Sequence, residues 1–246
     1  FDFRLFNDQE YALAVREKNS VEDITRVLYP NDSTYAGKRL RLKQQYFLSS
    51  ASMQDIIRRY KKVRGANGAC DFSGFAAHCA VQLNDTHPTV SIPELIRLLM
   101  LEGLEFDAAF DIARETFSYT NHTIMSEALE KWELELFNSV VPKLGEIICR
   151  INDKLNAELR AAGVNFDLAP VLDVNSNPLN PVIGVRSFGD VPEEAAERAL
   201  GFMRGLLDGG IMACGKHFPG HGDTAEDSHY GTASSTKTWA EMRETE

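Results

Sequence analysis

The 246-residue sequence lacks several features that would each identify a class of protein. It has no run of about 20 apolar residues, which a helix needs to cross a bilayer, so we expect no membrane partner. It begins at Phe1 without the basic and apolar segments of a secretion signal. Because it begins and stops abruptly, we expect a piece of a longer protein.

Cysteine is scarce, and its spacing excludes two kinds of cross-linked protein. The four cysteines are scattered along the chain, and no two of them form a CxxC pair. A disulfide framework and a zinc knuckle both need closely spaced cysteines. We therefore predict reduced, mostly buried thiols and a cytoplasmic location.

Basic residues are outnumbered by acidic ones, which argues against a nucleic-acid partner. The net charge is −10, and bulk attraction to phosphate backbones needs the opposite sign. Residues 38–64 are an exception, with nine basic side chains and one acidic. We interpret them as a solvated helix face, and phosphate or nucleotide contact is the alternative.

The chain has two consecutive parts that differ in net charge and in apolar pattern. Residues 1–163 carry a net charge of −3 and residues 164–246 one of −7, which first indicates that two pieces are joined. Apolar periodicity in the first part predicts mostly helices, with two short strands. The helices are expected at 11–18, 21–28, 39–63, 93–101, 107–117, 127–137 and 141–158, and the strands at 80–83 and 117–120.

The second part has the pattern of a strand–helix–strand unit. The apolar run 164–174 predicts a buried strand, and 211–215 predicts the next one. Between them a helix begins with an Asp190–Glu193 capping box and ends at Gly209. Its predicted packing face contains Ala195, Ala199, Phe202 and Leu206. Such a unit pairs its strands in parallel, so the fold class is α/β.

Polar residues follow the ends of four predicted strands. They are Asn84–His87, Asn121–His122, Asp173 and Lys216–His217. Ligands of parallel α/β proteins bind at these carboxyl ends. We therefore expect the chemistry of the chain there.

The segment 216–229 is the densest of these clusters and holds three of the six histidines. Its proline and glycines exclude a helix, so it is predicted to be a long loop. A zinc site is one interpretation, but His217 and His221 cannot share a helical face. An acid–base pair is more economical, because Asp227 can hold one ring nitrogen of His229 and raise the basicity of the other. Lys216 and His217 would then bind substrate hydroxyls or anionic groups.

Three motifs in the second part carry a family resemblance. They are Ala169–Asn175, Asn180–Gly189 and Lys216–His229. Together they resemble family 3 glycoside hydrolases, and most closely the bacterial β-N-acetylhexosaminidase branch. The resemblance covers about residues 157–246 and implies part of a (β/α) barrel that hydrolyses terminal N-acetylglucosamine without a cofactor.

The same resemblance implies roles for individual residues. Asp227 and His229 match the acid/base pair, an exception to the usual two carboxylates of glycosidases. Arg186, Lys216 and His217 match sugar-binding positions, and we add Asp173 to the substrate-binding residues. The catalytic nucleophile, an Asp on a later strand, is expected beyond Glu246, and the early barrel strands are absent.

Five motifs in the first part carry a second resemblance. They are Arg26–Asp32, Leu40–Phe47, Asp55–Arg59, Gln82–Pro88 and Tyr119–Trp132. In this order they resemble glycogen (α-1,4-glucan) phosphorylase over about residues 1–156. The resemblance implies the N-terminal part of a Rossmann-like, two-lobed glycosyltransferase fold.

This second resemblance implies a glucan site and a cofactor. Asn31 and Asp32 match a loop that gates the cleft, and Asp85 and His87 match the lining of the glucosyl site. His122 matches a residue that holds the 6-hydroxyl of the glucosyl unit. The family's cofactor is pyridoxal phosphate, and its lysine lies in the lobe that this chain lacks.

We therefore predict a chimera of residues 1–156 and 157–246, joined near Asn156–Gly163 inside a helix. Its expected partner is an oligosaccharide or glucan, and unpaired strand edges favour homo-oligomers. Three functions remain open: α-glucan phosphorolysis, hydrolysis of terminal N-acetylglucosamine, and carbohydrate binding without turnover. Because each site is half built, we expect little or no catalysis by the chain alone.

Overall fold

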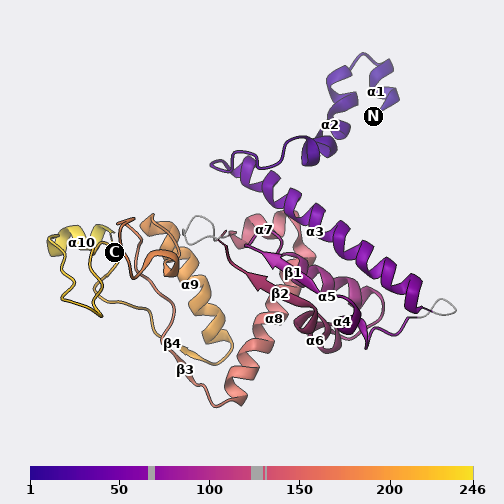
Figure 1. The fold of residues 1–246 in the computed structure, drawn as a ribbon. Helices are drawn as coiled ribbons and strands as arrows, with labels where there is room; N and C mark the ends of the chain where they lie inside the picture. The colour runs from indigo at the N-terminus through magenta and orange to yellow at the C-terminus, as the bar shows by residue number, and fades with distance from the viewer. Residues whose placement is uncertain (66–69, 123–129, 131, 246) are drawn as a thin grey trace. The chain divides into compact units, whose positions relative to one another are not determined.

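The computed structural model describes residues 1–65, 70–122, 130 and 132–245, which fall into two compact units (Figure 1). Unit 1 comprises Phe1–Tyr119 and Leu134–Gly145. Unit 2 comprises Thr120–Glu133 and Glu146–Glu246. Within the described ranges, the search for a helix of the length and apolarity that a membrane span requires finds none.

Unit 1 is mainly helical, and the helix-rich prediction for the first part of the chain is confirmed. Its sheet has two strands, β1 and β2. The elements are α1 (Phe3–Asn7), α2 (Tyr11–Arg26), α3 (Tyr35–Arg64), α4 (Phe75–His78), β1 (Val81–Asn84), α5 (Ser91–Leu101), α6 (Phe106–Thr116), β2 (Phe117–Thr120) and α7 (Leu134–Val140).

Two of the predicted helices in this unit differ from the structure. The helices expected at 11–18 and 21–28 are one continuous helix, α2, because Asn19 and Ser20 lower helix propensity without ending the helix. Of the helix expected at 127–137, residues 127–129 and 131 lie outside the described residues. Its last part forms α7.

The core of unit 1 lies where α3 contacts α5 and α5 contacts α6. Apolar side chains fill it, among them Leu42, Ile57, Leu95, Leu99 and Ala109. Burying these side chains supplies the main favourable term for folding.

One buried charge ties α3 to α5 within this core. The carboxylate of Glu94 is fully buried and accepts two hydrogen bonds of 2.7 Å from Arg97. The hydroxyl of Ser50 on α3 donates to the same carboxylate at 2.6 Å. Glu94 also raises the pKa of the Arg97 guanidinium, chiefly through their hydrogen bond. A buried carboxylate needs these partners to offset its desolvation.

Unit 2 contains the predicted strand–helix–strand unit. Strands β3 and β4 pair in parallel, with Phe166 opposite Met212, which confirms the expected pairing. The elements are the second part of α8 (Pro142–Ala161), β3 (Phe166–Asp167), the 3-10 helix η2 (Gly184–Arg186), α9 (Pro192–Asp208), β4 (Met212–Ala213) and α10 (Trp239–Thr245).

The buried strand expected over 164–174 is wrong in extent and burial. Only Phe166–Asp167 is a strand, and a single bridge joins Val171 to Lys216 further along. Phe166, Leu168 and Leu172 are exposed. A run this apolar forms a full strand only where neighbouring strands cover it, and in the described part of unit 2 it pairs with 212–216 alone.

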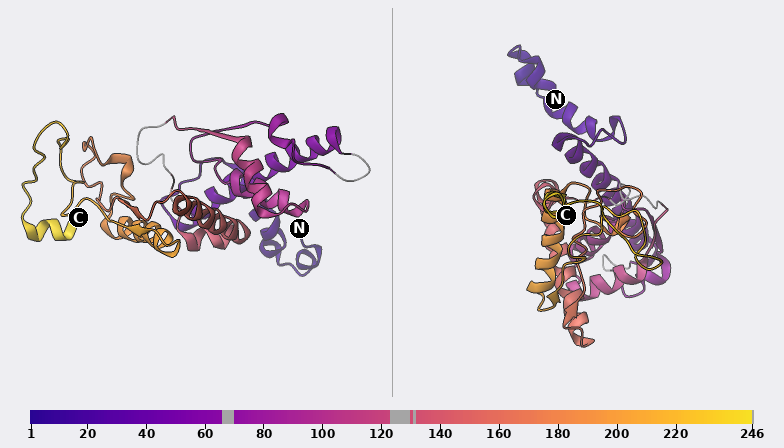
Figure 2. Two further views of the ribbon diagram at one scale, coloured as in Figure 1. Left: turned by 90° about the horizontal axis from the view of Figure 1, so that it is seen from below. Right: turned by 90° about the vertical axis from the view of Figure 1, so that its left-hand side faces the viewer.

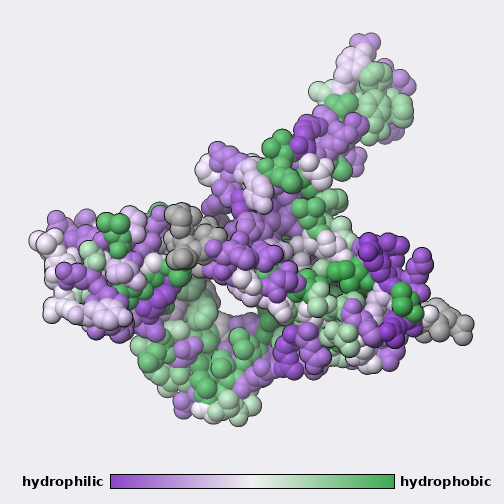
Figure 3. Space-filling view, viewed as in Figure 1, coloured by the Kyte–Doolittle hydropathy of each residue, from purple (hydrophilic) through white to green (hydrophobic). Residues whose placement is uncertain are grey.

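Helix α9 also departs from the expectation at two points. It begins at Pro192, and its N-cap is Val191 without a side-chain hydrogen bond, so the Asp190–Glu193 capping box is not formed. Ala195, Ala199 and Leu206 are buried as predicted, but Phe202 is exposed. Figure 3 shows apolar residues gathered at the surface over α8, α9 and the β3–β4 pair.

Candidate functional site

The segment that follows β4 carries the candidate site. Between Cys214 and Thr238 the chain forms no helix, as the loop prediction for 216–229 requires. Figure 2 shows the irregular course of this stretch, coloured orange to yellow, from two further sides. The loop is held by contacts to the segment 170–189, which follows β3.

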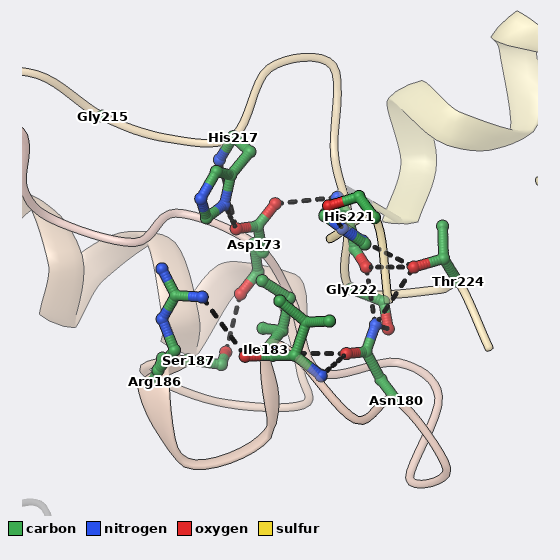
Figure 4. A network of polar contacts seen from close by, with 12 residues as sticks. Asp173, Asn180, Ile183, Arg186, Ser187, Gly215, His217, His221, Gly222 and Thr224 are labelled. Carbon is green, nitrogen blue, oxygen red and sulfur yellow. Dashed lines mark hydrogen bonds and ion pairs between the residues drawn. The ribbon is translucent and has the colours of Figure 1, made fainter. Parts of the chain in front are cut away.

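Asp173 is the centre of these contacts (Figure 4). Its carboxylate has no solvent exposure. Its Oδ2 atom accepts from the His217 amide at 3.1 Å and lies 2.6 Å from the His217 Nδ1 atom. Its Oδ1 atom accepts from the His221 amide at 2.8 Å. Asp173 therefore contacts the loop itself, and its predicted role in substrate binding stays a prediction.

The Asn180 side chain makes a second set of hydrogen bonds to the loop. Its amide nitrogen donates to the carbonyls of His221 at 2.6 Å and Gly222 at 3.2 Å. Its oxygen accepts from the amides of Val182 and Ile183, at 2.8 and 2.7 Å. Asn180 is buried, so the loop approaches its side chain closely. Sequence analysis placed Asn180 in a motif but gave it no role.

The approach of the loop to the chain near Asp173 requires a glycine at position 222. A Cβ atom there would lie 1.6 Å from the carbonyl oxygen of Val174. No rotation of a side chain relieves a clash with backbone, so any other residue would push the loop away.

Asp227 and His229 form the predicted pair. The His229 amide and Nδ1 atom both lie close to Asp227 Oδ1, at 2.8 and 2.7 Å. The hydrogen bonds from the amide and then the ring of His229 lower the pKa of Asp227. Near neutral pH Asp227 is therefore ionised and can only accept, so Nδ1 carries the proton. The Nε2 atom of His229 is the ring nitrogen left for a ligand, and this side chain is 74% exposed.

The other histidine of the loop makes contacts of its own. The Nδ1 atom of His221 lies 2.5 Å from Thr224 Oγ1, and its Nε2 atom lies 3.2 Å from Ser228 Oγ. Among the described residues, no three His, Cys, Asp or Glu side chains come together as metal ligands. The geometry thus uses the histidines in hydrogen bonds.

A pocket of about 560 Å³ opens beside the Asp173–His217 contact. Lys216 and His217, both predicted to bind substrate, line it together with Phe218. Helix α9 supplies Pro192, Ala196 and Leu200, and α10 supplies Trp239, Met242 and Arg243. The predicted residue Arg186 does not line this pocket; it is exposed on η2 and donates to the Val182 carbonyl at 3.3 Å. A few polar groups above an apolar lining are typical of a small-molecule site.

Of the residues predicted for a glucan site, His87 lines a smaller pocket of about 150 Å³ in unit 1, whereas Asn31, Asp32 and Asp85 do not line it. His87 and Tyr29 line it and meet edge to face, with ring centroids 6.1 Å apart. Arg41 also lines it and lies over the Tyr29 ring. The guanidinium of Arg41 is 3.4 Å from Asp32, so the loop of Asn31 and Asp32 is linked to this pocket.

Two further predicted residues belong to the same set. Asp85 follows β1 with a left-handed backbone, at φ 58°, which turns the chain sharply towards His87. His122 is exposed and belongs to unit 2, so the structure brings four of the five glucan residues into one unit.

Several of the nine basic side chains of 38–64 form ion pairs within unit 1. Arg58 and Arg59 both pair with Asp55, one turn earlier. Lys61 pairs with Glu102 at 2.6 Å. These contacts agree with the interpretation as a solvated helix face.

Comparisons with known proteins match the two parts of the chain to two families. The profile described as carbohydrate phosphorylase matches residues 1–173, and the profile of the glycosyl hydrolase family 3 N terminal domain matches residues 142–246. The two matches overlap in α8 and in the segment up to Asp173.

Several curated phosphorylases are similar to the first part. Alpha-glucan phosphorylase 2, cytosolic, of Arabidopsis thaliana is 44% identical over 185 residues, which are 74% of this chain and 22% of that protein. The liver form of glycogen phosphorylase of Ovis aries is 48% identical over 158 residues, and that of Homo sapiens 47% over 160. Each alignment covers 63% of this chain and 19% of the relative.

The chain thus spans about a fifth of the length of these relatives. Its resemblance has two parts, and the larger match covers more than half of its residues. On that match, the chain belongs to the carbohydrate phosphorylase family, with a second segment similar to the N-terminal domain of family 3 glycosyl hydrolases.

Proposed function

We propose that unit 2 binds the terminal N-acetylhexosamine of an oligosaccharide and that Asp227 and His229 transfer the proton in its hydrolysis. The observation that carries this proposal is the Asp227–His229 contact, which leaves one ring nitrogen exposed. Residues 216–220 of the same loop line the pocket, whereas Asp227 and His229 themselves do not. The match of residues 142–246 to the glycosyl hydrolase family 3 N terminal domain supports it.

The proposed chemistry follows from the direction of these hydrogen bonds. Asp227 accepts from Nδ1 and holds the His229 ring with its Nε2 atom open to a ligand. A protonated Nε2 gives its proton to the glycosidic oxygen as the bond between that oxygen and the anomeric carbon breaks. The electron pair of the bond leaves with the oxygen, which departs as a hydroxyl group. A water molecule then bonds to the anomeric carbon and returns a proton to Nε2. Lys216 and His217 hold sugar hydroxyls, and Arg186 is proposed to join them when the substrate binds.

The carboxylate among the described residues that line the pocket is Asp173, whose two oxygens are taken up by contacts with the loop. We therefore propose that the chain supplies binding and proton transfer and turns over little by itself, as a carbohydrate-binding chimera. Its fold would be a partial (β/α) barrel joined near Asn156–Gly163 to part of a two-lobed glycosyltransferase. The four free cysteines support a cytoplasmic location. None of the four is buried, so the prediction of mostly buried thiols is wrong.

The test combines binding with hydrolysis. We expect N-acetylglucosamine to bind in saturation-transfer NMR and an aryl N-acetyl-β-glucosaminide to be hydrolysed slowly. His229→Ala should abolish the hydrolysis and keep the binding, because the side chain is exposed and carries only the proton. His78→Ala removes an exposed histidine of unit 1 and is the matched control. Absence of binding, or hydrolysis that survives His229→Ala, would refute the proposal.

A second candidate function, binding of an α-glucan by unit 1, is favoured by the identity to phosphorylases. Asn31, Asp32, Asp85 and His87 would hold the glucosyl unit, and His122 its 6-hydroxyl. Glycogen added to the chain should shift NMR signals of His87, and His87→Ala should weaken the binding. Failure of glycogen to bind would rule this function out.

Pyridoxal phosphate, the cofactor that the family implies, does not fit the pocket beside His87 in unit 1. This pocket is about 150 Å³, and no lysine occurs among the described residues that line it. An enzyme-bound pyridoxal phosphate needs a lysine amine for its Schiff base. We therefore derive no phosphorolysis at this pocket and expect no Schiff-base absorbance when the cofactor is added.

A further inference from the structure

Two aromatic rings at the rim of the unit 2 pocket have no role in the proton transfer. Phe218 and Trp239 both line the pocket, yet they are 88% and 56% exposed. Their ring centroids lie 6.2 Å apart at an interplanar angle of 71°. Rings of this size dominate binding energetics when a ligand covers them, because each buries a large apolar area.

The segment that carries Trp239 is fixed to the loop of the candidate site. Lys237 pairs with Asp223 at 3.1 Å, and Ser235 donates to the same carboxylate at 3.2 Å. Next to the ring, the Thr238 amide and hydroxyl both donate to Glu241 at 2.7 Å, which starts α10 at Trp239. The ring is thus held in place before a ligand arrives, which lowers the entropic cost of binding.

The remaining lining of the pocket is mixed in a way that suits a sugar. Lys216, His217 and Arg243 bring nitrogen donors, whereas Ala196 and Leu200 of α9 are apolar. A pyranose ring has hydroxyl groups around its edge and C–H groups on its faces. An aromatic face is electron-rich and attracts such C–H groups. The pocket therefore offers partners for both surfaces of one pyranose.

We propose that the Trp239 ring, with Phe218 packed edge-on against it, forms an aromatic platform that stacks on the C–H face of the bound pyranose. This inference rests on the proposed function and names the part of the site that recognises the ring.

Tryptophan emission tests the platform directly, because the chain has only two tryptophans. Trp132→Phe leaves Trp239 as the single reporter. Titration with N,N′-diacetylchitobiose should shift its emission to shorter wavelength as the sugar covers the ring. In calorimetry, Trp239→Ala should weaken binding about tenfold, whereas Trp239→Phe should retain most of it. Phe202→Ala, which removes an exposed ring outside the pocket, should leave the affinity unchanged.

The outcomes separate this inference from the proposed function. Sugar binding with unchanged affinity in Trp239→Ala and no shift in emission would overturn the platform and leave the proposed function standing. Failure of the unsubstituted chain to bind the sugar would overturn both.

Discussion

Two carboxylate–histidine contacts in unit 2 differ in their exposure to solvent. The Asp173 carboxylate is fully buried, and its oxygens contact main-chain amides as well as the His217 ring. Asp227 is partly exposed, and its partner His229 is largely open to solvent. Burial suits Asp173 to organising the loop, whereas exposure leaves His229 free to meet a ligand.

The ionisation of Asp227 gives the loop a defined dependence on pH. Its pKa is lowered from the ordinary value of 3.8, chiefly by the His229 amide hydrogen bond. A lowered pKa in the folded state means that the ionised carboxylate stabilises the fold above the unfolded value. This contribution is lost as the pH falls through the folded value. We expect the His229 amide signal in NMR to show an acidic step whose midpoint lies below the ordinary carboxyl pKa of 3.8.

Replacing the carboxylate provides the control for this titration. In Asp227→Asn the group no longer ionises, so the same amide signal should show no step at acidic pH. A step of equal size in Asp227→Asn would show that another group causes it.

Sequence analysis found one of these contacts and missed the other. Asp227 and His229 are two residues apart, so a local turn brings them together and their spacing is enough to predict the pair. Asp173 and His217 are 44 residues apart. Their contact depends on the parallel path of the two chain segments, which the residues near either one do not specify.

At the scale of elements, Gly201 inside α9 and Gly209 at its C-cap provide a matched comparison. Gly201 lies inside the helix with nothing within 4 Å of a Cβ atom, so Gly201→Ala should stabilise the fold by about 0.5–1 kcal/mol. Gly209 caps the helix, and a Cβ atom there would lie 2.3 Å from Asn156 Cγ. Gly209→Ala should therefore destabilise the packing of α9 on α8. Urea denaturation of both variants measures the two effects.

The contact behind this prediction is specific. The Asn156 side chain donates to the Gly205 carbonyl at 3.2 Å and is buried, so it cannot move aside freely. If Gly209→Ala proves as stable as the unsubstituted chain, the close approach of α8 to α9 is incorrect.

The same elements show which sequence signals were reliable. Apolar periodicity over 39–63 predicted α3 within a few residues, because a long amphipathic stripe leaves little choice of structure. The run 164–174 is equally apolar, but a strand depends on its neighbours and forms only where β4 and Lys216 pair with it. The capping box at Asp190 failed because α9 starts at Pro192, a favoured first residue of a helix.

At the scale of the whole chain, the two units should unfold in separate steps. Each has a buried carboxylate of its own, Glu94 in unit 1 and Asp173 in unit 2. Both tryptophans, Trp132 and Trp239, belong to unit 2. Thermal unfolding followed by tryptophan emission should therefore report unit 2, whereas far-ultraviolet circular dichroism reports all helices. We expect the two midpoints to differ.

Substitution of each carboxylate shows which unfolding step belongs to which unit. Glu94→Ala leaves the half-buried Arg97 without its partner and should destabilise unit 1 by about 3–5 kcal/mol, without moving the emission midpoint. Asp173→Ala should lower the emission midpoint. Coincident midpoints that move together in both variants would contradict two independently folding units.

The contacts that hold the 216–222 loop decide which of its residues can be substituted without moving the loop. The side chains of Asp173 and Asn180 hydrogen-bond mainly to main-chain amide and carbonyl groups of the loop. Those groups are the same whichever amino acid occupies position 217 or 221. Substitutions at these two positions can therefore change the side chains that face a ligand while the hydrogen bonds that hold the loop remain. The loop can thus acquire new ligands by mutation without losing its position.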